Sequence, residues 1–375
     1  MSDKLSVLIA AISGRALAQS AQRGGYQPLV VDFFGDQDTL QIARDHVRLT
    51  GNLANGIAEN ALRVALEGLA DRYRPMGIVC GSGFEDRPQL LQSVAARWRV
   101  FGNIAETVTK VKNPEMLSAI CAELAIPFPE FSLTEPSNPA DWLAKRIGGA
   151  GGSHIRPASQ PAGRSVYYQR KVPGIPTSLF FLADGARSTV IGFSSQWVLG
   201  TASRPYRYGG AVQPATVTPQ IATLLSTAVD RLVAATSMVG LNSADFHIDG
   251  ERYWLLDVNP RPGATLDIFE LPEGSLFACH MAACAGRLAA APRYPAGAKA
   301  AAIVYAEDDV SCVPALDWPD WTADRPQPGI TIKAGEPLCT VYACDDAAAG
   351  AKALADQRRH TILAWMRAGQ QRCRG

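Results

Sequence analysis

Several features that would assign a chain to a special class are missing from this sequence. No apolar run approaches the roughly 20 residues that a membrane-spanning helix requires, so we expect no membrane insertion. The formal net charge is only +1, which gives no electrostatic reason to expect binding of nucleic acid or of an anionic membrane. The first residues run into a strand-like segment rather than a cleavable signal, and we therefore expect a cytoplasmic protein.

Cysteine is present but never in an arrangement typical of a metal or redox site. There is no Cys-x-x-Cys pair, so neither zinc nor a redox dithiol is indicated. Buried reduced thiols are the simpler interpretation for a cytoplasmic protein. The eight cysteines are scattered along the chain, at positions 80, 121, 279, 284, 312, 339, 344 and 373.

The two best-known nucleotide-binding loops are also absent. The glycines at 148–152 are not followed by Gly-Lys-Ser/Thr, so they do not form a Walker A loop. The turn from Ala11 to Gly14 lacks Gly-x-Gly-x-x-Gly, which argues against a dinucleotide fold in which Asp32 would hold a ribose. The strand–helix–strand pattern of residues 5–32 nevertheless predicts a parallel sheet at the start of the chain.

The 375 residues are enough for two or three domains with large cores, and apolar periodicity predicts elements along their whole length. Further helices are expected at 59–74, 88–99, 114–125, 221–239, 275–290 and 346–368, and further strands at 76–80, 100–103, 301–305, 329–333 and 337–342.

What the chain does carry is a cluster of oxygen ligands in residues 245–263. Asp249-Gly250 is typical of a hairpin turn, and folding back there brings Asp245 near Asp257 and Asn259. Asp257 and Asn259 are two residues apart, so both point to one face of a strand. A few hard oxygen ligands suit Mg²⁺ that keeps waters and shares phosphate oxygens. Arg261 would place a guanidinium beside this cluster, where a carboxylate or phosphate binds; an ordinary exposed hairpin is the alternative.

A second segment adds a feature typical of anion binding. Lys145 precedes a loop with four glycines in five positions, Gly148, Gly149, Gly151 and Gly152. Glycines let successive backbone N–H groups close around an anion, and a nearby lysine adds a point charge. Taken alone, the loop is as typical of a flexible connector. A lysine and glycine loop about a hundred residues before an acidic, Asn- and Arg-containing hairpin is a much more specific combination.

Together these segments resemble the ATP-grasp superfamily. Asp257-Val-Asn-Pro-Arg261 resembles its metal motif, Glu-x-Asn-x-Arg, with Asp in place of Glu. Lys145 and the glycine loop resemble the loop that covers the phosphates, and Gln169 to Gly174 resembles the adenine hinge. Order and spacing match from about residue 1 to 290. Within the superfamily, the chain is most similar to the predicted ATP-dependent carboligases related to biotin carboxylase, on the segments Ser82–Asp86, Pro173–Pro176 and Tyr208–Pro214.

The resemblance implies an α/β fold with α+β lobes, which is the ATP-grasp fold, in three parts. An N-terminal α/β domain with a parallel sheet, preceding the ATP-grasp region, is expected at 1–104. The two-lobed ATP-grasp region is expected at 105–290, with a small lid lobe at about 128–185 and a metal-binding lobe at about 186–290. A β-rich C-terminal segment with a final helix is expected at 291–375.

The resemblance also implies roles for individual residues. Mg²⁺, or Mn²⁺, would be held by Asp245, Asp257 and Asn259, and Arg261 would steady an acyl phosphate or the oxyanion that follows it. ATP would be bound by Lys112, Lys145, Gly148, Gly149, Gly151, Gly152, Gln169, Arg170, Lys171 and Val172.

The sequence departs from the family pattern at two places. The family often has an acidic ribose ligand two positions after the hinge glycine, where this chain has Pro176. The family also has a lysine near the start of the helix expected here at 114–125. Lys112 is the nearest candidate but is offset by a residue or two, and Lys110 competes for that role. A solvated surface lysine is the alternative for each.

Substrate contacts follow less directly from the sequence. Ser82 and Glu85 follow a strand end, where open α/β sheets bind ligands, although a connecting turn is an equal alternative. Arg204 and Arg207 could bind an anionic substrate through bidentate contacts, with a surface loop as the alternative. Asp267 could bind the attacking amine.

The resemblance implies a ligase that converts a substrate carboxylate to an acyl phosphate and joins it to an amine or similar nucleophile, releasing ADP and phosphate. The partners would be a small-molecule acid and amine, in small-molecule or cofactor biosynthesis, with one-carbon cofactor assembly as one option. A homodimer is left open. The alternatives are a biotin-carboxylase-like enzyme that activates bicarbonate and a catalytically silent ATP-binding protein of the same fold.

Overall fold

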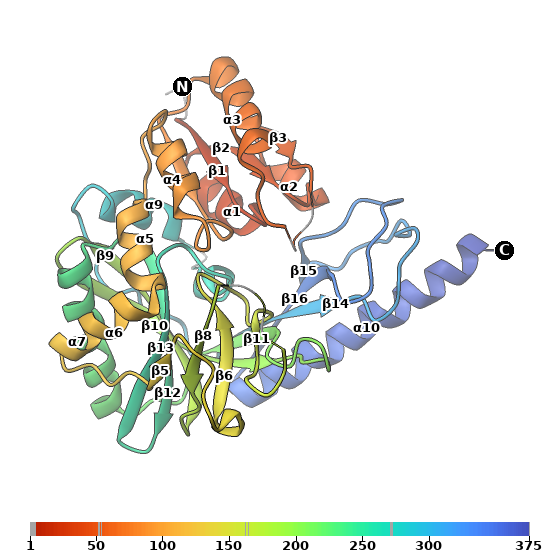
Figure 1. The fold of residues 1–375 in the computed structure, drawn as a ribbon. Coiled ribbons are helices and arrows are strands. Elements are labelled where there is room, and N and C mark those ends of the chain that lie inside the picture. Colours follow the sequence, from red (N-terminus) through yellow and green to blue (C-terminus); the bar gives the residue numbers. More distant parts are fainter. Residues whose placement is uncertain are drawn as a thin grey trace.

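The protein folds around three β-sheets (Figure 1). The computed structural model describes residues 5–374 except 52, 54, 162, 164, 271 and 272; of residues 370–374, Cys373 among them, only the backbone is described. Within that part of the chain no helix has the length and hydropathy needed to cross a bilayer. Each cysteine whose side chain is described is a free thiol.

The N-terminal part is a four-stranded parallel sheet in the order β3-β2-β1-β4, as the sequence predicts. Val7, Leu8 and Ile9 are fully buried, since helices cover both faces of a parallel sheet. The strand predicted at 100–103 is wrong, because Val100 makes only an isolated bridge to Ile78. The elements are β1 (Ser6–Ala10), α1 (Arg15–Arg23), β2 (Gln27–Asp32), α2 (Gln37–Ile42), β3 (Asp45–Arg48), α3 (Glu59–Tyr73), β4 (Ile78–Cys80) and α4 (Pro88–Ala95).

The largest sheet has eight strands in the order β13-β12-β9-β10-β11-β14-β16-β15. The hairpin predicted around Asp249-Gly250 joins β12 to β13, and Gly250 adopts the left-handed φ of +61° that this turn requires. Its strands up to residue 259 are β9 (Ile175–Asp184), β10 (Ser188–Val198), β11 (Tyr208–Gln213), β12 (Val239–Asp249) and β13 (Arg252–Asn259), and its helices are α5 (Ala105–Lys112), α6 (Pro114–Glu123) and α7 (Pro219–Thr236).

A smaller antiparallel sheet, in the order β5-β8-β6-β7, forms the lid lobe. Its elements are β5 (Phe131–Ser132), η1 (Pro139–Asp141), β6 (Trp142–Arg146), β7 (Ile155–Pro157) and β8 (Val166–Arg170). The predicted lid boundary near residue 185 extends too far, because β9 pairs with β10 and β12 in the large sheet. Residues Thr177 to Ala183 of β9 are all buried, as expected of a central strand.

The C-terminal segment completes the large sheet instead of forming a separate body. β14 (Ala298–Tyr305) pairs with β11, and β16 (Pro337–Asp345) pairs with β14 and β15 (Thr322–Ala323). The strand predicted at 329–333 is wrong, since only Ile332 forms a bridge, to Val310. The final helix, α10 (Ala348–Arg374), packs on β14 and β16 before its end projects from the body (Figure 1).

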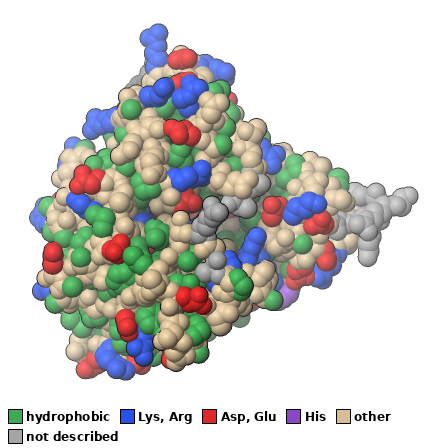
Figure 2. All heavy atoms as spheres, in the orientation of Figure 1, with side chains coloured by type: hydrophobic (Ala, Val, Ile, Leu, Met, Phe, Trp, Pro, Cys, Tyr) green, Lys and Arg blue, Asp and Glu red, His purple; other side chains and the backbone are tan. Residues whose placement is uncertain are grey.

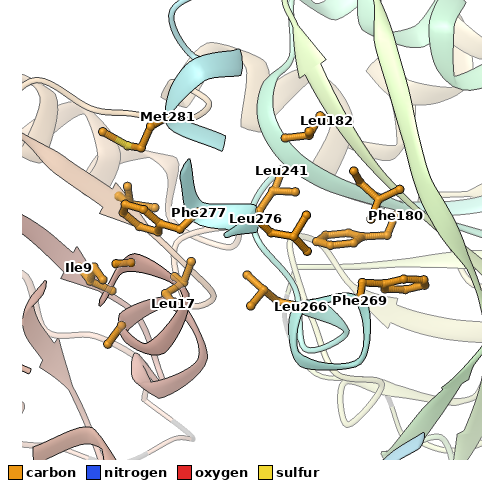
Figure 3. Close-up of a cluster of buried hydrophobic side chains, with 14 of the residues drawn as sticks. Ile9, Leu17, Phe180, Leu182, Leu241, Leu266, Phe269, Leu276, Phe277 and Met281 are labelled. Carbon is orange, nitrogen blue, oxygen red and sulfur yellow. The ribbon is translucent and has the colours of Figure 1, made fainter. Parts of the chain in front are cut away.

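Two short helices connect the N-terminal sheet to the large sheet. Ile9 and Leu17 of the N-terminal part face Phe277 of α9 (Leu276–Ala283), whose other neighbours include Phe180 and Leu241 of the large sheet (Figure 3). α8 (Leu266–Phe269) contributes to the same core. α9 is shorter than the predicted helix at 275–290, because the chain turns at Gly286 with φ +76°. On the face in Figure 2, acidic and basic side chains are interspersed.

Candidate active site

The proposed metal ligands converge on the β12–β13 hairpin. Asp245 lies directly opposite Asp257 in the strand register, and Asn259 lies opposite Ser243. Nδ2 of Asn259 donates to Oδ2 of Asp245 at 3.1 Å. The prediction that these three side chains meet on one face is confirmed.

Lys112 faces this hairpin from the end of α5. Its Nζ lies 2.9 and 2.8 Å from the two carboxylate oxygens of Asp257 and 3.2 Å from Oδ1 of Asn259. Lys110, the competing candidate, instead pairs with Glu106 near the surface. The arrangement therefore favours Lys112 as the lysine of the site.

The two carboxylates of the cluster repel each other. Burial raises the pKa of Asp245, and the neighbouring charge of Asp257 raises it further. Two carboxylates and one amide oxygen form a hard ligand set that fits Mg²⁺. Within the described chain, no group of three or more His, Cys, Asp or Glu side chains could hold a metal alone. Such a set fits a metal ion that takes its remaining ligands from phosphates and water.

Across from the hairpin, two buried side chains of the lid meet. Nζ of Lys145 on β6 donates to Oε1 of Gln169 on β8 at 2.5 Å. Burial lowers the pKa of Lys145 to about 8, although Asp257 and Asp245 act in the opposite direction. The Nε2 atom of Gln169 is buried without a hydrogen-bond partner. An unused buried donor is costly, so this amide is available to a ligand that supplies an acceptor.

The glycine loop between β6 and β7 is packed against two other loops. Gly148, Gly151 and Gly152 have left-handed φ angles of +71°, +68° and +71°. A Cβ on Gly148 would lie 2.5 Å from the carbonyl oxygen of Glu85, and one on Gly152 would lie 1.9 Å from that of Tyr206. The N–H of Tyr208 also donates to the carbonyl of Gly151 at 3.0 Å. Because these contacts fix the loop, a flexible connector is the weaker interpretation.

The remaining glycine and the hinge make contacts of their own within the lid and with the hairpin. Gly149 packs on the ring of His154. The N–H groups of Arg170 and Lys171 already donate to the carbonyls of Glu130 and Asp141, so these two amides do not face a base. Of the hinge backbone, the Val172 carbonyl contacts Nδ1 of His247 at 3.1 Å.

Arg261 lies at the end of the hairpin and is held by a residue that the sequence suggested only as a substrate contact. Its Nε donates to Oε1 of Glu85 at 2.6 Å, while Oε2 of Glu85 accepts the N–H groups of Gly83 and Phe84. Burial alone would raise the pKa of Glu85, but Arg261 and Lys112 lower it to about 2. Glu85 is thus an ionised partner that orients Arg261. Ser82 lies half-buried in the same turn.

Two arginines suggested as substrate contacts have partners within the protein. Arg207 donates to the carbonyls of Leu199 and Gly335 and stacks on Tyr305, and Arg204 also reaches the carbonyl of Gly335. These contacts tie the β10–β11 loop to the C-terminal segment. They give Arg207 a structural role, and its expected contact with an anionic substrate stays a prediction.

Asp267 is also committed elsewhere. Both of its oxygens accept from the guanidinium of Arg15, at 2.7 and 2.6 Å. The carboxylate of Asp267 is therefore held by Arg15, and its expected contact with an amine stays a prediction. No local pattern in the sequence indicates this pair, because the two residues are 252 positions apart.

Residues 110–265 match the model of the ATP-grasp domain family. The chain contains an ATP-grasp domain. The family resemblance and the fold class expected from the sequence are therefore confirmed. The matched segment begins two residues before Lys112 and ends after the Asp257–Arg261 motif, so it includes every residue of the cluster described above except Glu85. No curated protein matches the sequence.

Solved structures share this fold over nearly the whole chain. A biotin carboxylase–ATP complex from Campylobacter jejuni superposes with a TM-score of 0.71, at 14% identity over 96% of this chain and 95% of that one. An ADP complex of N5-carboxyaminoimidazole ribonucleotide synthetase gives 0.68, at 15% identity and 98% of both chains. An L-amino acid ligase from Bacillus licheniformis gives 0.68, at 12% identity over 95% and 97%. At these identities the likeness shows the fold.

Proposed function

We propose that this ATP-grasp protein is an ATP-dependent ligase that activates a carboxylate and joins it to an amine. The observation that carries the proposal is the meeting of Asp245, Asp257 and Asn259 with Lys112, while Lys145 and an unpartnered Gln169 amide lie in the lid. Hard oxygens and lysines around one point suit a metal-bound triphosphate.

Each group has a role in this reaction. Lys145 and Lys112 contact the phosphates, and the glycine loop covers them. The Nε2 atom of Gln169 donates to the adenine. Mg²⁺ at Asp245, Asp257 and Asn259 would neutralise phosphate charge when bound.

The reaction itself has two steps. A carboxylate oxygen of the acid attacks the γ-phosphorus, the bond to the β-phosphate oxygen breaks, and ADP leaves. The amine nitrogen then attacks the acyl carbon, phosphate leaves with its oxygen, and the amine loses a proton. Arg261, held by Glu85, donates to the oxyanion that develops on the acyl group.

Two alternatives make different predictions about the substrate. A bicarbonate-activating enzyme is favoured by the likeness to biotin carboxylase structures, and it would need no organic acid. A silent ATP-binding protein would have no use for a half-buried Arg261 oriented by a buried glutamate, and the Arg261–Glu85 pair therefore supports an enzyme. We place the reaction in small-molecule or cofactor biosynthesis, with small-molecule acid and amine as its partners.

The test is a screen for ADP formation with pools of acids and amines, with bicarbonate as a separate arm. We expect an acid-dependent and amine-dependent signal that requires Mg²⁺. Bicarbonate alone producing the signal would favour the biotin-carboxylase-like reaction. A wild-type protein that binds ATP but forms no ADP with any pool would favour the silent binder.

Arg261→Ala separates catalysis from nucleotide binding. Loss of one oriented donor to a developing oxyanion costs on the order of 10²–10³ in rate. ATP affinity, measured by calorimetry, should change much less, because this contact exists mainly along the reaction path. Arg261→Lys should recover little activity, since an ammonium cannot reproduce the planar fork. Equal losses of affinity and turnover would make Arg261 a ligand of ground-state ATP.

A further inference from the structure

We infer that Lys112 is a built-in counter-cation of the metal site, so that a divalent cation binds tightly only together with the nucleotide. The inference rests on the proposed function in one respect: the phosphates of ATP are the group to which the lysine transfers. The competition between lysine and metal follows from the geometry of this chain alone.

The first observation is where the ammonium group lies. Its three hydrogen bonds go to Oδ1 and Oδ2 of Asp257 and to Oδ1 of Asn259, which are the oxygens of the proposed ligand set. An ammonium has three donors, and all three are used here. A metal ion chelated by Asp257 and Asn259 would approach the same oxygens from the same side. The two cations therefore compete for one position.

The second observation is the balance of charge around that position. Asp257 is bonded to Lys112 and Asp245 interacts with it, whereas Glu85, also within its electrostatic reach, is already paired with Arg261. Lys145 is a second cation nearby. Adding a divalent cation while Lys112 stays in place would collect four positive charges against two carboxylates. Like charges at such distances in a partly buried site repel strongly. Metal binding is then unfavourable until Lys112 leaves or more negative charge arrives.

The third observation is the position of Lys112 at the end of a helix. It is the last residue of α5, and its stem has four rotatable carbons. Its ammonium lies close enough to Glu85 to lower that pKa, so the glutamate side of the site is within its electrostatic reach. A triphosphate brings several negative charges and strong acceptors. Lys112 can bond to these while Asp257 and Asn259 turn to the metal.

Metal and nucleotide binding are therefore coupled through one side chain. Each ligand should raise the affinity of the other by the same factor, as linkage requires. Removing the ammonium should raise metal affinity in the absence of nucleotide and weaken the coupling. The buried pair of carboxylates then lacks its cation, and a metal ion replaces it.

The experiment uses the full chain and Mn²⁺ as the probe, with free Mn²⁺ measured by electron paramagnetic resonance. Wild type, Lys112→Met, Lys112→Arg and Lys110→Met are titrated without nucleotide, and then with a non-hydrolysable ATP analogue. Lys110→Met is the matched control, since Lys110 is on the same helix and pairs only with Glu106 near the surface. Lys112→Arg keeps the charge.

Without nucleotide, we expect Lys112→Met to bind Mn²⁺ at least about tenfold more tightly than wild type, within the roughly 5–150-fold range of coupled sites. Lys110→Met and Lys112→Arg should behave like wild type. The analogue should tighten Mn²⁺ binding in wild type and do so much less in Lys112→Met. If circular dichroism shows that Lys112→Met is unfolded, Lys112→Gln takes its place.

The outcomes separate this inference from the proposed function. Equal Mn²⁺ affinities of wild type and Lys112→Met without nucleotide would overturn the inference even if both bind ATP. Tighter Mn²⁺ binding by Lys112→Met in a protein that never binds the analogue would support the counter-cation and overturn the proposed function. Failure of every variant to bind Mn²⁺ under both conditions would overturn both.

Discussion

The protein contains two buried clusters of opposite charges, and they are built differently. The first is the site cluster, which we define as Lys112, Lys145, Asp245, Asp257 and Asn259. The second, which we call the domain clasp, consists of Arg15, Asp38, Asp267 and Asp324. In the clasp, Arg15 of α1 binds Asp267 through two contacts and Asp324 through two more, at 3.0 and 3.2 Å. It joins the N-terminal sheet to α8 and to the residue after β15.

The clasp leaves little for a ligand to supply. Asp38 accepts the backbone N–H groups of Asp324 and Arg325, and the hydroxyl of Thr340 donates to Asp324. Burial, with the nearby charges of Asp324 and other aspartates, raises the pKa of Asp36 to about 9, so this neighbouring carboxyl is neutral at pH 7. Protonation of Asp36 thus keeps a further negative charge away from the clasp.

The site cluster instead depends on point charges and unmet donors. Its cations are lysines, whose ammonium groups can exchange partners, whereas the guanidinium of Arg15 is a planar fork fixed on two carboxylates. The Nε2 atom of Gln169 is a buried donor to which the lid offers no acceptor. A fork with every contact made indicates structure, and exchangeable lysines beside an unused donor indicate a binding site.

The sharpest way to break this comparison is to remove a residue from the site cluster. Asp257→Ala should reduce metal-dependent ADP formation at least about a thousandfold, since metal stabilisation of transferred charge is worth several kcal/mol. The fold should persist, because Lys112 keeps its contact with Asn259 and the loss of its pair with Asp257 is offset in part by relief of the repulsion with Asp245. Coupled-enzyme assays and thermal melts check both.

The matched control for this variant is Asp249→Ala. Asp249 lies in the same hairpin but is near the surface, paired with Arg252. It should retain wild-type activity. Wild-type turnover by Asp257→Ala would remove Asp257 from the metal site.

The same comparison predicts the opposite result for the domain clasp. Arg15→Met leaves Asp267 and Asp324 without their cation, and the loss of one partner of a buried ion pair typically costs about 4 kcal/mol. The free energy of unfolding from urea titration should fall by this amount, while ATP affinity of the folded protein changes little. Arg63→Met is the control, because the exposed Arg63–Glu67 pair should contribute only about 0–1 kcal/mol. A large loss of ATP affinity with unchanged stability would place the clasp in the binding site.

How far the sequence could predict these two clusters depends on the distance between their members. The β12–β13 hairpin follows from an Asp-Gly turn and alternation within 15 residues, so Asp245, Asp257 and Asn259 could be brought together correctly. The glycine loop and Lys145 are also local patterns. The four-stranded parallel sheet followed from alternating strand and helix periods.

Other features could not be predicted, because nothing local specifies them. Glu85 and Arg261 are 176 residues apart, and Arg15 and Asp324 are 309 apart. The position of Asp267 after the metal motif led us to expect that it binds the amine. In the structure its carboxylate pairs with Arg15. Likewise, local patterns predict that β9 is a strand but not which sheet it joins.

The Glu85–Arg261 pair can be tested through pH. The pKa of Glu85 is about 2 in the folded protein, below its usual value of 4.5. A lowered pKa gives stability that is complete above about pH 4.5 and is lost as the pH falls toward 2. Between pH 5 and pH 3 this one group should account for about 2 kcal/mol of lost unfolding free energy. Urea titrations at both values measure the loss.

Glu85→Gln provides the comparison for this measurement. It should be less stable than wild type at pH 7, because Arg261 loses its partner, but its stability should fall less steeply between pH 5 and pH 3. Identical pH slopes for the two proteins would show that Glu85 is not held ionised by Arg261.

The smallest expected effect concerns the glycine loop and depends on two glycines next to each other. Gly151 and Gly152 both have a left-handed φ, so an alanine at either position introduces the same backbone strain. Only at Gly152 would the new Cβ meet another atom, the carbonyl oxygen of Tyr206, whereas nothing lies within 4 Å at Gly151. Overpacking of this kind costs typically 1–3 kcal/mol, so Gly152→Ala should weaken ATP binding roughly tenfold more than Gly151→Ala. Calorimetric titration of ATP into both variants compares their affinities. Because the backbone strain is the same, any difference reports the contact between the lid and the β10–β11 loop. Equal affinities would mean that ATP binds with this contact open, and the loop would then close on the phosphates without resting on Tyr206.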